Sequence, residues 1–358
     1  MTALHDAALG KVSVVGDRLR PVRIWLYVIA LMVLIMVMVG GMTRLTGSGL
    51  SITTWKPISG IIPPLTLEDW QAEFDGYKLI PQYEVYNSWM TLEDFKGIFW
   101  WEWGHRFLGR IIAFAFAIPF LVFLFQKRLT RDMALPLGGL FVLGGFQGFL
   151  GWWMVSSGLS ELTSVSQYRL AAHLTAALAL LLALIAVARR MRPQPTEGVI
   201  QPWNKWAAWA LLLLLVIQIA AGAFVAGIQA GMGFNTWPLM DGKFIPDGLY
   251  AYEPSWLSHF EHHLTVQFNH RMIAYLITIV AAVMVVFQAR GNGFGGVHRW
   301  LIAIMVLVLA QVGLGIATVL SMVNIDIAVA HQGLAFILAG AIVAYLADMR
   351  KTRALGTV

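Results

Sequence analysis

Apolar residues occur in long, nearly unbroken stretches along this chain of 358 residues, and short polar segments separate them. A helix that crosses a bilayer needs about 20 consecutive, mostly apolar residues. Eight stretches reach that length, at roughly 23–43, 104–126, 134–156, 168–189, 206–228, 265–288, 299–321 and 327–348. The alternation that is typical of membrane β-barrels is absent. The pattern therefore predicts an all-α integral membrane protein with eight transmembrane helices.

The composition supports this class and excludes others. Hydrophobic residues make up 58% of the chain, charged residues 12%, and the mean hydropathy is +0.70, whereas a soluble chain carries about 25% charged residues. A soluble nucleotide enzyme, a disordered protein and a secreted disulfide scaffold are excluded. The chain has no cysteine, so it has no disulfide, thiolate metal site or iron–sulfur cluster.

Lysine and arginine are distributed unequally between the two sides of the predicted bundle. The N-terminal segment, the loops after the second, fourth and sixth spans, and the C-terminal segment hold 16 of the 25. The opposite loops hold 5, together with 14 of the 19 acidic residues. Because positive residues mark the cytoplasmic side, we expect both termini in the cytoplasm and two long outer loops, at about 44–103 and 229–264. The net charge of +6 follows from this sorting and does not indicate a nucleic-acid partner.

Four arginines belong to neither group, because they lie in the first turns of predicted spans at the outer face. They are Arg106, Arg110, Arg169 and Arg271. A charge inside a span is costly and is often functional. The alternative is that these side chains only extend to the membrane interface.

The chain also repeats itself. Motifs of the first four spans recur in the last four, at offsets of 158 to 182 residues that change only in loops. The matched segments are Gly40 to Pro57 with Gly222 to Pro238, His105-Arg106 with His270-Arg271, Gln147 to Gly151 with Gln311 to Gly315, and His173 with His331. Each half has an even number of spans, so the repeat is parallel.

This repeat sets the expected domain organisation. A cytoplasmic N-terminal segment at 1–22 precedes an N-terminal four-helix half at 23–190. A cytoplasmic linker at 191–205 leads to a C-terminal four-helix half at 206–348, and a cytoplasmic tail follows at 349–358.

Four of the nine histidines occupy matching positions, about one turn inside the outer ends of the even-numbered spans. They are His105, His173, His270 and His331. A single histidine in such a helix is usually a satisfied core residue, but four at symmetric positions repeat the cost of burying imidazole. Two histidines on facing helices can hold a metal ion or the two axial sites of a haem iron.

The neighbouring residues favour haem over a bare metal ion. Zinc or copper would need further nitrogen, sulfur or carboxylate ligands, and no carboxylate is repeated beside the pairs. The repeated neighbours are arginines, which can bind haem propionates through two parallel hydrogen bonds. A small residue follows each histidine by four positions, on the same helix face, at Gly109, Ala177, Ala274 and Ala335. We therefore expect two haem sites near the outer surface, one in each half.

The halves differ at one ionisable position. Glu102 precedes His105 by three residues, and the equivalent residue before His270 is the neutral Gln267. An acid beside only one site is a candidate proton acceptor. The alternative is a water-facing helix start, where a carboxylate suits the helix dipole. On the first interpretation the N-terminal half holds the haem that reacts, and the C-terminal half holds a haem that remains bound.

Several separate motifs closely resemble those of haem A synthases, over nearly the whole chain. They are residues 40–51, Thr54-Trp55-Lys56-Pro57, Glu102-Trp103-Gly104-His105-Arg106, Phe268-Asn269-His270-Arg271 and Ala330-His331-Gln332. The resemblance implies an oxidoreductase that converts the C8 methyl group of haem O to a formyl group, giving haem A for terminal oxidases. The chain is similar to the cysteine-free members of that family.

The resemblance also implies roles for the site residues. It assigns His270 and His331 to the iron of a haem b cofactor, with Arg271 beside them. It assigns His105 and His173 to the iron of the substrate haem, near the arginines Arg106, Arg110 and Arg169, and it makes Glu102 the catalytic acid.

The partners and the location follow from the same resemblance. It implies haem O as substrate, contact with haem O synthase and oxidase assembly factors, and an unnamed electron acceptor. It is also compatible with a homo-oligomer. The expected location is the bacterial inner membrane or the equivalent mitochondrial membrane, with the haem sites toward the outer side.

If both axial positions of the substrate iron are taken, either one histidine leaves or the chemistry occurs at the macrocycle edge. The sequence leaves both routes open.

Other functions fit part of the pattern. A dihaem b-type electron carrier needs no acid on one side only, and it would stack its haems across the membrane, whereas the four histidines lie at one depth. A haem transporter fits a parallel repeat, but only scattered residues such as Gln147, Gln218 and Gln311 interrupt the inner half of the bundle. A structural assembly factor leaves the histidines unexplained.

Overall fold

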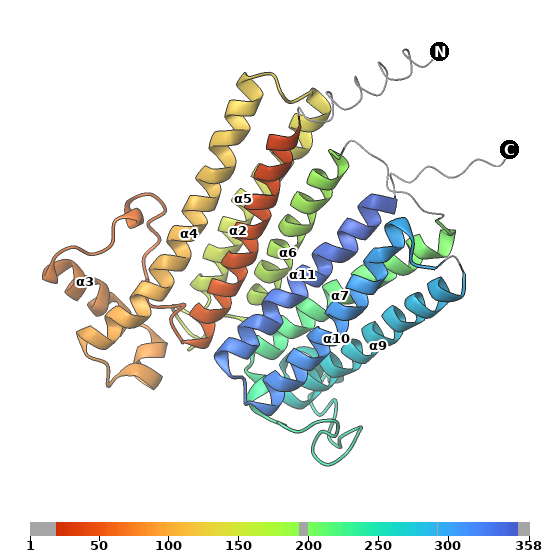
Figure 1. Cartoon of the computed structure of the whole chain (residues 1–358). Helices are drawn as coiled ribbons and strands as arrows, with labels where there is room; N and C mark the ends of the chain where they lie inside the picture. Colours follow the sequence, from red (N-terminus) through yellow and green to blue (C-terminus); the bar gives the residue numbers. More distant parts are fainter. Residues whose placement is uncertain (1–18, 193–199, 292, 350–358) are drawn as a thin grey trace.

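The computed structural model describes residues 19–192, 200–291 and 293–349 (Figure 1). Most of the expected N-terminal segment, part of the linker and most of the C-terminal tail lie outside these residues. Eight helices are long and apolar enough to cross a membrane: α2 (Arg20–Leu45), α4 (Leu92–Phe125), α5 (Arg131–Ser156), α6 (Gln167–Arg190), α7 (Pro202–Gly227), α9 (His263–Arg290), α10 (Arg299–Leu320) and α11 (Ile325–Met349). The described residues form no β-sheet. The predicted all-α membrane class is confirmed.

One helix boundary differs from the sequence prediction. Helix α4 begins at Leu92, twelve residues before the expected start at 104, and it extends outward beyond the bundle (Figure 1). Thr91 and Asp94 form a capping box that starts the helix there. The segment from Leu92 carries charges and was expected to be loop, but it buries Phe95 and Phe99 on one face. It is therefore an amphipathic helix rather than an irregular connection.

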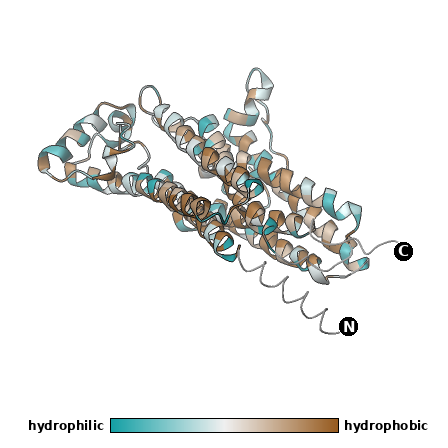
Figure 2. Ribbon diagram, turned by 90° about the horizontal axis from the view of Figure 1, so that it is seen from above, coloured by the Kyte–Doolittle hydropathy of each residue, from teal (hydrophilic) through white to brown (hydrophobic). Residues whose placement is uncertain are grey.

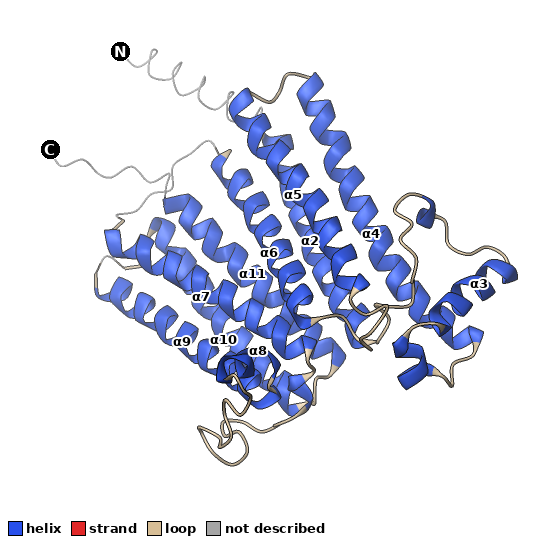
Figure 3. Ribbon diagram, turned by 180° about the vertical axis from the view of Figure 1, so that it is seen from behind, coloured by secondary structure: helices blue, strands red, loops and turns tan. Residues whose placement is uncertain are grey.

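Each half of the chain is a ring of four helices. Helices α2, α4, α5 and α6 pack in that cyclic order, and α7, α9, α10 and α11 do the same. The histidine-bearing helices, α4 with α6 and α9 with α11, are therefore diagonally opposed within their rings. The two rings join because α2 and α6 pack against α11, and α6 packs against α7 (Figures 1 and 3).

Helices α2 and α11 pack against each other at two glycines. A Cβ atom on Gly41 would lie 2.5 Å from Oε1 of Gln332, and one on Gly333 would lie 3.1 Å from Sδ of Met38. The Gln332 side chain also donates a hydrogen bond to the carbonyl of Val37, at 3.0 Å. The two halves are thus joined directly near their histidines.

The buried apolar residues form two clusters. The larger one includes residues from all eight long helices. The smaller one joins the first outer loop, α3 (Leu67–Lys78) and the extended start of α4, and consists of Leu50, Ile52, Phe74, Tyr77, Ile80, Phe95 and Phe99. Figure 2 shows the α3 region as a more polar projection beside the apolar bundle.

Short elements complete the loops. They are the single-turn segments Ser59–Ile61, Ala230–Met232, Ser255–Leu257 and Gly296–His298, the π-helical turn Tyr83–Asn87 and α8 (Ser258–Glu261).

Candidate functional site

Each of the four predicted histidines packs against a glycine on the preceding long helix. The pairs are Gly40 with His105, Gly151 with His173, Gly222 with His270, and Gly315 with His331. A Cβ atom added to any of these glycines would lie 3.0–3.2 Å from an atom of the imidazole ring. Because that is closer than packed side chains tolerate, glycine is what leaves room for each ring.

The imidazole rings of the C-terminal half face each other. The ring centroids of His270 and His331 are 6.4 Å apart, and the ring planes are inclined by 73°. Two metal–nitrogen bonds of about 2 Å each account for most of that separation, so one metal atom fits between the rings. His105 and His173 hold the equivalent places on α4 and α6.

The residues around these rings suit haem iron rather than a bare ion. No group of three or more His, Cys, Asp or Glu side chains in the described residues could hold a metal ion. A site with two protein ligands needs a group that supplies the remaining ligands itself, and haem does so through its macrocycle while taking histidine at its axial positions. The buried Nδ1 atom of His270 has no hydrogen-bond partner within the described part of the chain, so it leaves a nitrogen lone pair or N–H free for such a group.

Three buried amides contact three of the histidines. The Nε2 atom of Gln147 lies 3.1 Å from Nδ1 of His173, that of Gln218 lies 3.2 Å from Nε2 of His270, and that of Gln311 lies 3.1 Å from Nδ1 of His331. Each amide also donates to the backbone carbonyl of the same histidine, at 2.9–3.0 Å. These glutamines, which the sequence shows only as polar interruptions of the apolar bundle, thus each have a histidine as partner. Each one precedes the contacting glycine by four residues, on the same helix face, and that spacing could have revealed them.

The fourth position of this pattern is different. Met36 stands four residues before Gly40, where the other three helices have glutamine. Its Cε atom would lie 3.1 Å from a Cβ atom on Gly109, so it packs beside the helix that carries His105. The His105 side chain makes no hydrogen bond with any residue that the structure describes.

Arg106 and Arg271 fasten the outer loops in the same register. Each guanidinium donates from Nη2 and Nη1 to two loop carbonyls: Arg106 to Ile52 and Thr54, at 2.8 and 3.2 Å, and Arg271 to Phe234 and Thr236, at 2.8 and 2.9 Å. The internal repeat therefore extends to individual hydrogen bonds. Both arginines join a loop to the helix that carries a histidine.

The other two arginines also bind backbone carbonyls. Arg110 donates to the carbonyls of Pro57 and Lys56, at 2.9 and 3.0 Å. Arg169 donates to the carbonyl of Trp153, at 2.7 Å, and its guanidinium lies over the same indole ring. Two buried guanidinium nitrogens have no partner among the described residues, Nη1 of Arg110 and Nε of Arg271. Contact between any of these arginines and haem propionates stays a prediction.

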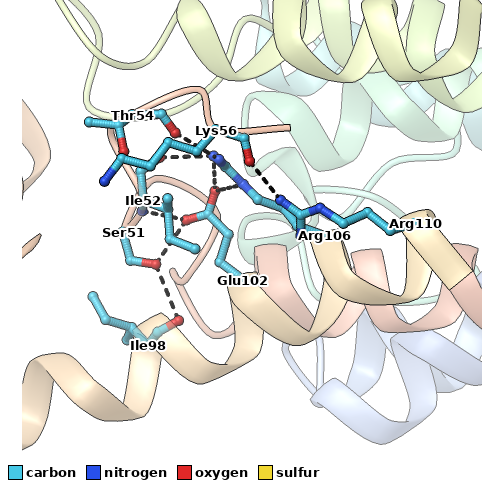
Figure 4. Close-up of polar contacts among 8 residues, drawn as sticks. All are labelled: Ser51, Ile52, Thr54, Lys56, Ile98, Glu102, Arg106 and Arg110. Atoms are coloured by element: carbon cyan, nitrogen blue, oxygen red, sulfur yellow. Dashed lines mark hydrogen bonds and ion pairs between the residues drawn. The ribbon is translucent and has the colours of Figure 1, made fainter. Parts of the chain in front are cut away.

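Glu102 is 2% exposed and lies in the body of α4, within a network of donors (Figure 4). Its Oε2 accepts from the Ser51 hydroxyl and the Ile52 N–H, both at 2.8 Å. Its Oε1 accepts from Nε and Nη2 of Arg106, at 3.1 and 2.6 Å. The alternative of a water-facing helix start is wrong, because the carboxylate is buried and α4 begins ten residues earlier, at Leu92.

Gln267 holds the same place in the C-terminal half with the opposite polarity. Its Nε2 donates to the carbonyls of Ala230 and Gly233, at 3.1 and 2.9 Å, and its Oε1 accepts from Arg271, at 3.1 Å. Glu102 therefore meets loop donors, whereas Gln267 meets loop acceptors. The charge difference between the halves is matched by the backbone orientation of the two loops.

Tyr77 of α3 is the ionisable neighbour of Glu102 from the smaller apolar cluster. Its hydroxyl donates to Oε1 of Gln82 at 3.0 Å and accepts from Nδ2 of Asn87 at 2.6 Å. Burial raises the pKa of the Tyr77 phenol, and the negative charge of Glu102 also raises it. Tyr77 therefore stays protonated at neutral pH and contributes no second negative charge beside Glu102.

Comparison with known proteins extends this picture to most of the chain. Residues 23–343 match the COX15-CtaA family, described as cytochrome oxidase assembly protein. A haem A synthase of Azorhizobium caulinodans is 51% identical over 327 residues, which are 91% of this chain and 93% of that protein. Those of Parvibaculum lavamentivorans and Rhizobium rhizogenes are 50% identical over 327 residues and 45% identical over 336 residues. These two alignments cover 91% and 94% of this chain, and 94% and 92% of the relatives.

Proposed function

This chain belongs to the family of cytochrome oxidase assembly proteins that includes the haem A synthases, and we propose that its two histidine pairs divide the work of that reaction. The protein is an oxidoreductase of haem biosynthesis that converts haem O to haem A. Its eight long apolar helices make it a multi-pass membrane protein. The observation that carries the proposed division is the buried carboxylate of Glu102 beside one histidine pair, where the other pair has the amide of Gln267.

We propose that His270 and His331 hold a haem b cofactor. Both are part of the ring of helices in which Gln267 replaces the acid, so this site lacks the carboxylate of its counterpart. Arg271 fastens the adjacent loop and keeps one buried N–H donor without a partner, which a propionate of haem b can accept. Haem b, when bound, supplies an iron centre that exchanges one electron at a time.

We propose that His105 and His173 hold the iron of the substrate haem O. The arrangement of His105 against Gly40 and of His173 against Gly151 repeats that of the C-terminal pair. Arg106 and Arg110 of α4 and Arg169 of α6 are the arginines of this half, and Nη1 of Arg110, buried without a partner among the described residues, suits an anionic group.

We propose that Glu102 takes up a proton during the reaction, and the Ser51 hydroxyl gives it a means to do so. The single hydroxyl hydrogen of Ser51 can point to Oε2 of Glu102, at 2.8 Å, or to the carbonyl of Ile98, at 3.3 Å. When it points to Ile98, the hydroxyl oxygen can accept a hydrogen bond from a protonated Oε2. The network therefore holds the carboxyl group in one place in both protonation states, while Ile52 and Arg106 continue to donate to it.

The partners follow from this assignment. Haem O is the substrate, and we propose that it comes from a haem O synthase in the same membrane and that the product goes to oxidase assembly factors. The proposed location is the bacterial inner membrane, with both sites toward the periplasmic side. The electrons removed from the methyl group pass to an acceptor outside this chain. Assembly into a homo-oligomer stays a prediction.

Pigment extraction tests the assignment. The protein is purified from cells that make haem O, its pigments are separated by chromatography, and each is measured relative to protein. We expect haem b together with haem O or haem A. Two haem b molecules per chain, with neither haem O nor haem A, would instead indicate a dihaem electron carrier.

A further inference from the structure

The four histidines share one packing arrangement, but a glutamine amide contacts only three of them in the described structure. We propose that Gln147, Gln218 and Gln311 are positioning residues that fix their histidines, and that His105, whose neighbouring helix has Met36 at the glutamine position, is the one iron ligand that can be exchanged. The inference rests on the proposed function, because it takes the histidines as iron ligands.

The geometry of the amides shows why they restrain the rings. In each case a single amide nitrogen contacts both the backbone carbonyl and a ring nitrogen of the same histidine. The amide therefore bridges the main chain and the ring, and rotation of the ring about its side-chain bonds breaks one of the two contacts.

The other end of each amide also suits a metal-bound imidazole. The Oε1 atoms of Gln147, Gln218 and Gln311 are buried without a hydrogen-bond partner. The oxygen and nitrogen exchange places when an amide turns by half a rotation, so the same side chain can accept from a ring N–H in place of its donated bond to the backbone carbonyl. An imidazole that binds a metal through one nitrogen keeps an N–H on the other, and an acceptor for that N–H orients the ring.

Methionine cannot provide either contact. The thioether of Met36 has no donor and is only a weak acceptor, and it stands where the repeat places Gln218 in the C-terminal half. The ring of His105 is therefore held by packing against Gly40, and its rotation breaks no hydrogen bond to the described residues.

This difference separates a site that can open from one that stays closed. Release of His105 from a bound iron would break one iron–nitrogen bond, the imidazole would depart as a neutral base, and no electron would be transferred. His105 would leave on the side of α4, the helix that also carries Glu102. His173, His270 and His331 keep their amide contacts, so the cofactor iron retains both ligands.

The test compares Met36→Gln, which restores the amide, with Met36→Leu, which removes the sulfur and adds no amide. Each holoprotein is purified from cells that make haem O, and pigment extraction first establishes its haem content. The reduced protein is then titrated with carbon monoxide, which binds ferrous haem only where an axial position is open, and the spectrum shows which haem binds it. We expect wild type and Met36→Leu to bind carbon monoxide at the substrate haem, and Met36→Gln to bind it about 10- to 100-fold more weakly, the range typical of contacts that orient metal ligands.

The reciprocal variant tests the closed site. Gln218→Met should allow carbon monoxide to bind haem b and should weaken haem b retention about tenfold or more, whereas Gln126→Met, at an exposed position, should do neither. Equal carbon monoxide binding by wild type, Met36→Leu and Met36→Gln, or none by wild type, overturns the inference while normal pigment content leaves the proposed function standing. Absence of haem O and haem A from every variant contradicts the proposed function itself.

Discussion

The two halves of this chain build the same scaffold around their histidines and then differ at two contacts. In both halves glycines make room for the imidazoles, and an arginine fastens the outer loop. The N-terminal half has Met36 and Glu102 where the C-terminal half has Gln218 and Gln267. One change removes a contact that holds a ligand, and the other adds a group that can carry a proton. On the proposed assignment, the comparison teaches that the repeat specifies binding, and that two substitutions specify where the reaction occurs.

The loops reinforce this difference. The first outer loop contains α3 and a separate apolar cluster, and it covers Glu102 with the N–H of Ile52 and the hydroxyl of Ser51. The second outer loop presents carbonyls to Gln267 instead. An acid is therefore stabilised in one half, and the equivalent position in the other half is built for a neutral donor.

The largest expected effect comes from removing a histidine. Replacing His270 or His331 with alanine should abolish binding of haem b, because only one axial ligand remains, while His105→Ala and His173→Ala should retain haem b and lose haem O and haem A. Absorption spectra and pigment extraction of the purified variants measure both. His263→Ala, at an exposed position of α9, is the control. Loss of the same pigment from both pairs of variants would break the comparison between the halves.

Exchanging the acid and the amide at Glu102 and Gln267 sharpens the comparison between the two halves. Glu102→Gln should keep haem b and reduce formation of haem A about 100-fold or more, the usual scale for losing an acid–base group. Gln267→Glu should keep the reaction chemistry but lower stability by about 1–3 kcal/mol, because its carboxylate meets two carbonyls and loses two donated hydrogen bonds. Pigment analysis measures the first effect and thermal unfolding the second. Normal output of haem A from Glu102→Gln would show that this carboxylate only supports the loop.

A smaller effect is expected from the loop arginine of the C-terminal half. Arg271→Leu removes the donors to Phe234 and Thr236 and should reduce haem b retention about tenfold. Lys243→Leu changes an exposed residue that pairs with Asp247, so it should retain haem b as wild type does. Haem b content after repeated washing of the purified protein is the measurement. Equal retention in the two variants would exclude Arg271 as a support for the site.

The smallest effect is expected from one added methyl group. In Gly315→Ala the new Cβ would lie 3.0 Å from Cε1 of His331, whereas nothing lies within 4 Å of a Cβ on Gly313. Overpacking of this kind costs about 1–3 kcal/mol, so Gly315→Ala should shift the haem b spectrum and lower its content in part. Gly313→Ala, on the same helix, should match wild type. If the two spectra are alike, the glycine does not define the space for the ring.

The fold was largely predictable because a bilayer requires a fixed length of apolar helix. The start of α4 was not predicted, because its charged residues resemble those of a loop. The capping residues Thr91 and Asp94 are the sequence feature that indicates a helix start there. The paired histidines were found through the repeat. Burial of Glu102 was not predictable, because the loop that covers it has no periodic pattern.

The glutamines show a different limit. Their presence was plain in the sequence, but each one acts on a histidine of another helix, 20 to 52 residues away along the chain. The only sequence feature that links these glutamines to the site is their spacing, four residues before a glycine on the same helix face. That spacing can be interpreted only after the structure shows the glycines in contact with the imidazoles.

The contact between α2 and α11 limits how far the two copies of the repeat can diverge. Position 36 and position 102 differ from their counterparts without changing the scaffold. Gly41 and Gly333 are more restricted, because each lies against a side chain of the other copy, and a methyl group on Gly41 would fall 2.5 Å from Oε1 of Gln332, which would have to shift. Each half thus supports the structure of the other at this contact. After the duplication that produced the repeat, the site in one half could change its function, but the two halves could not separate.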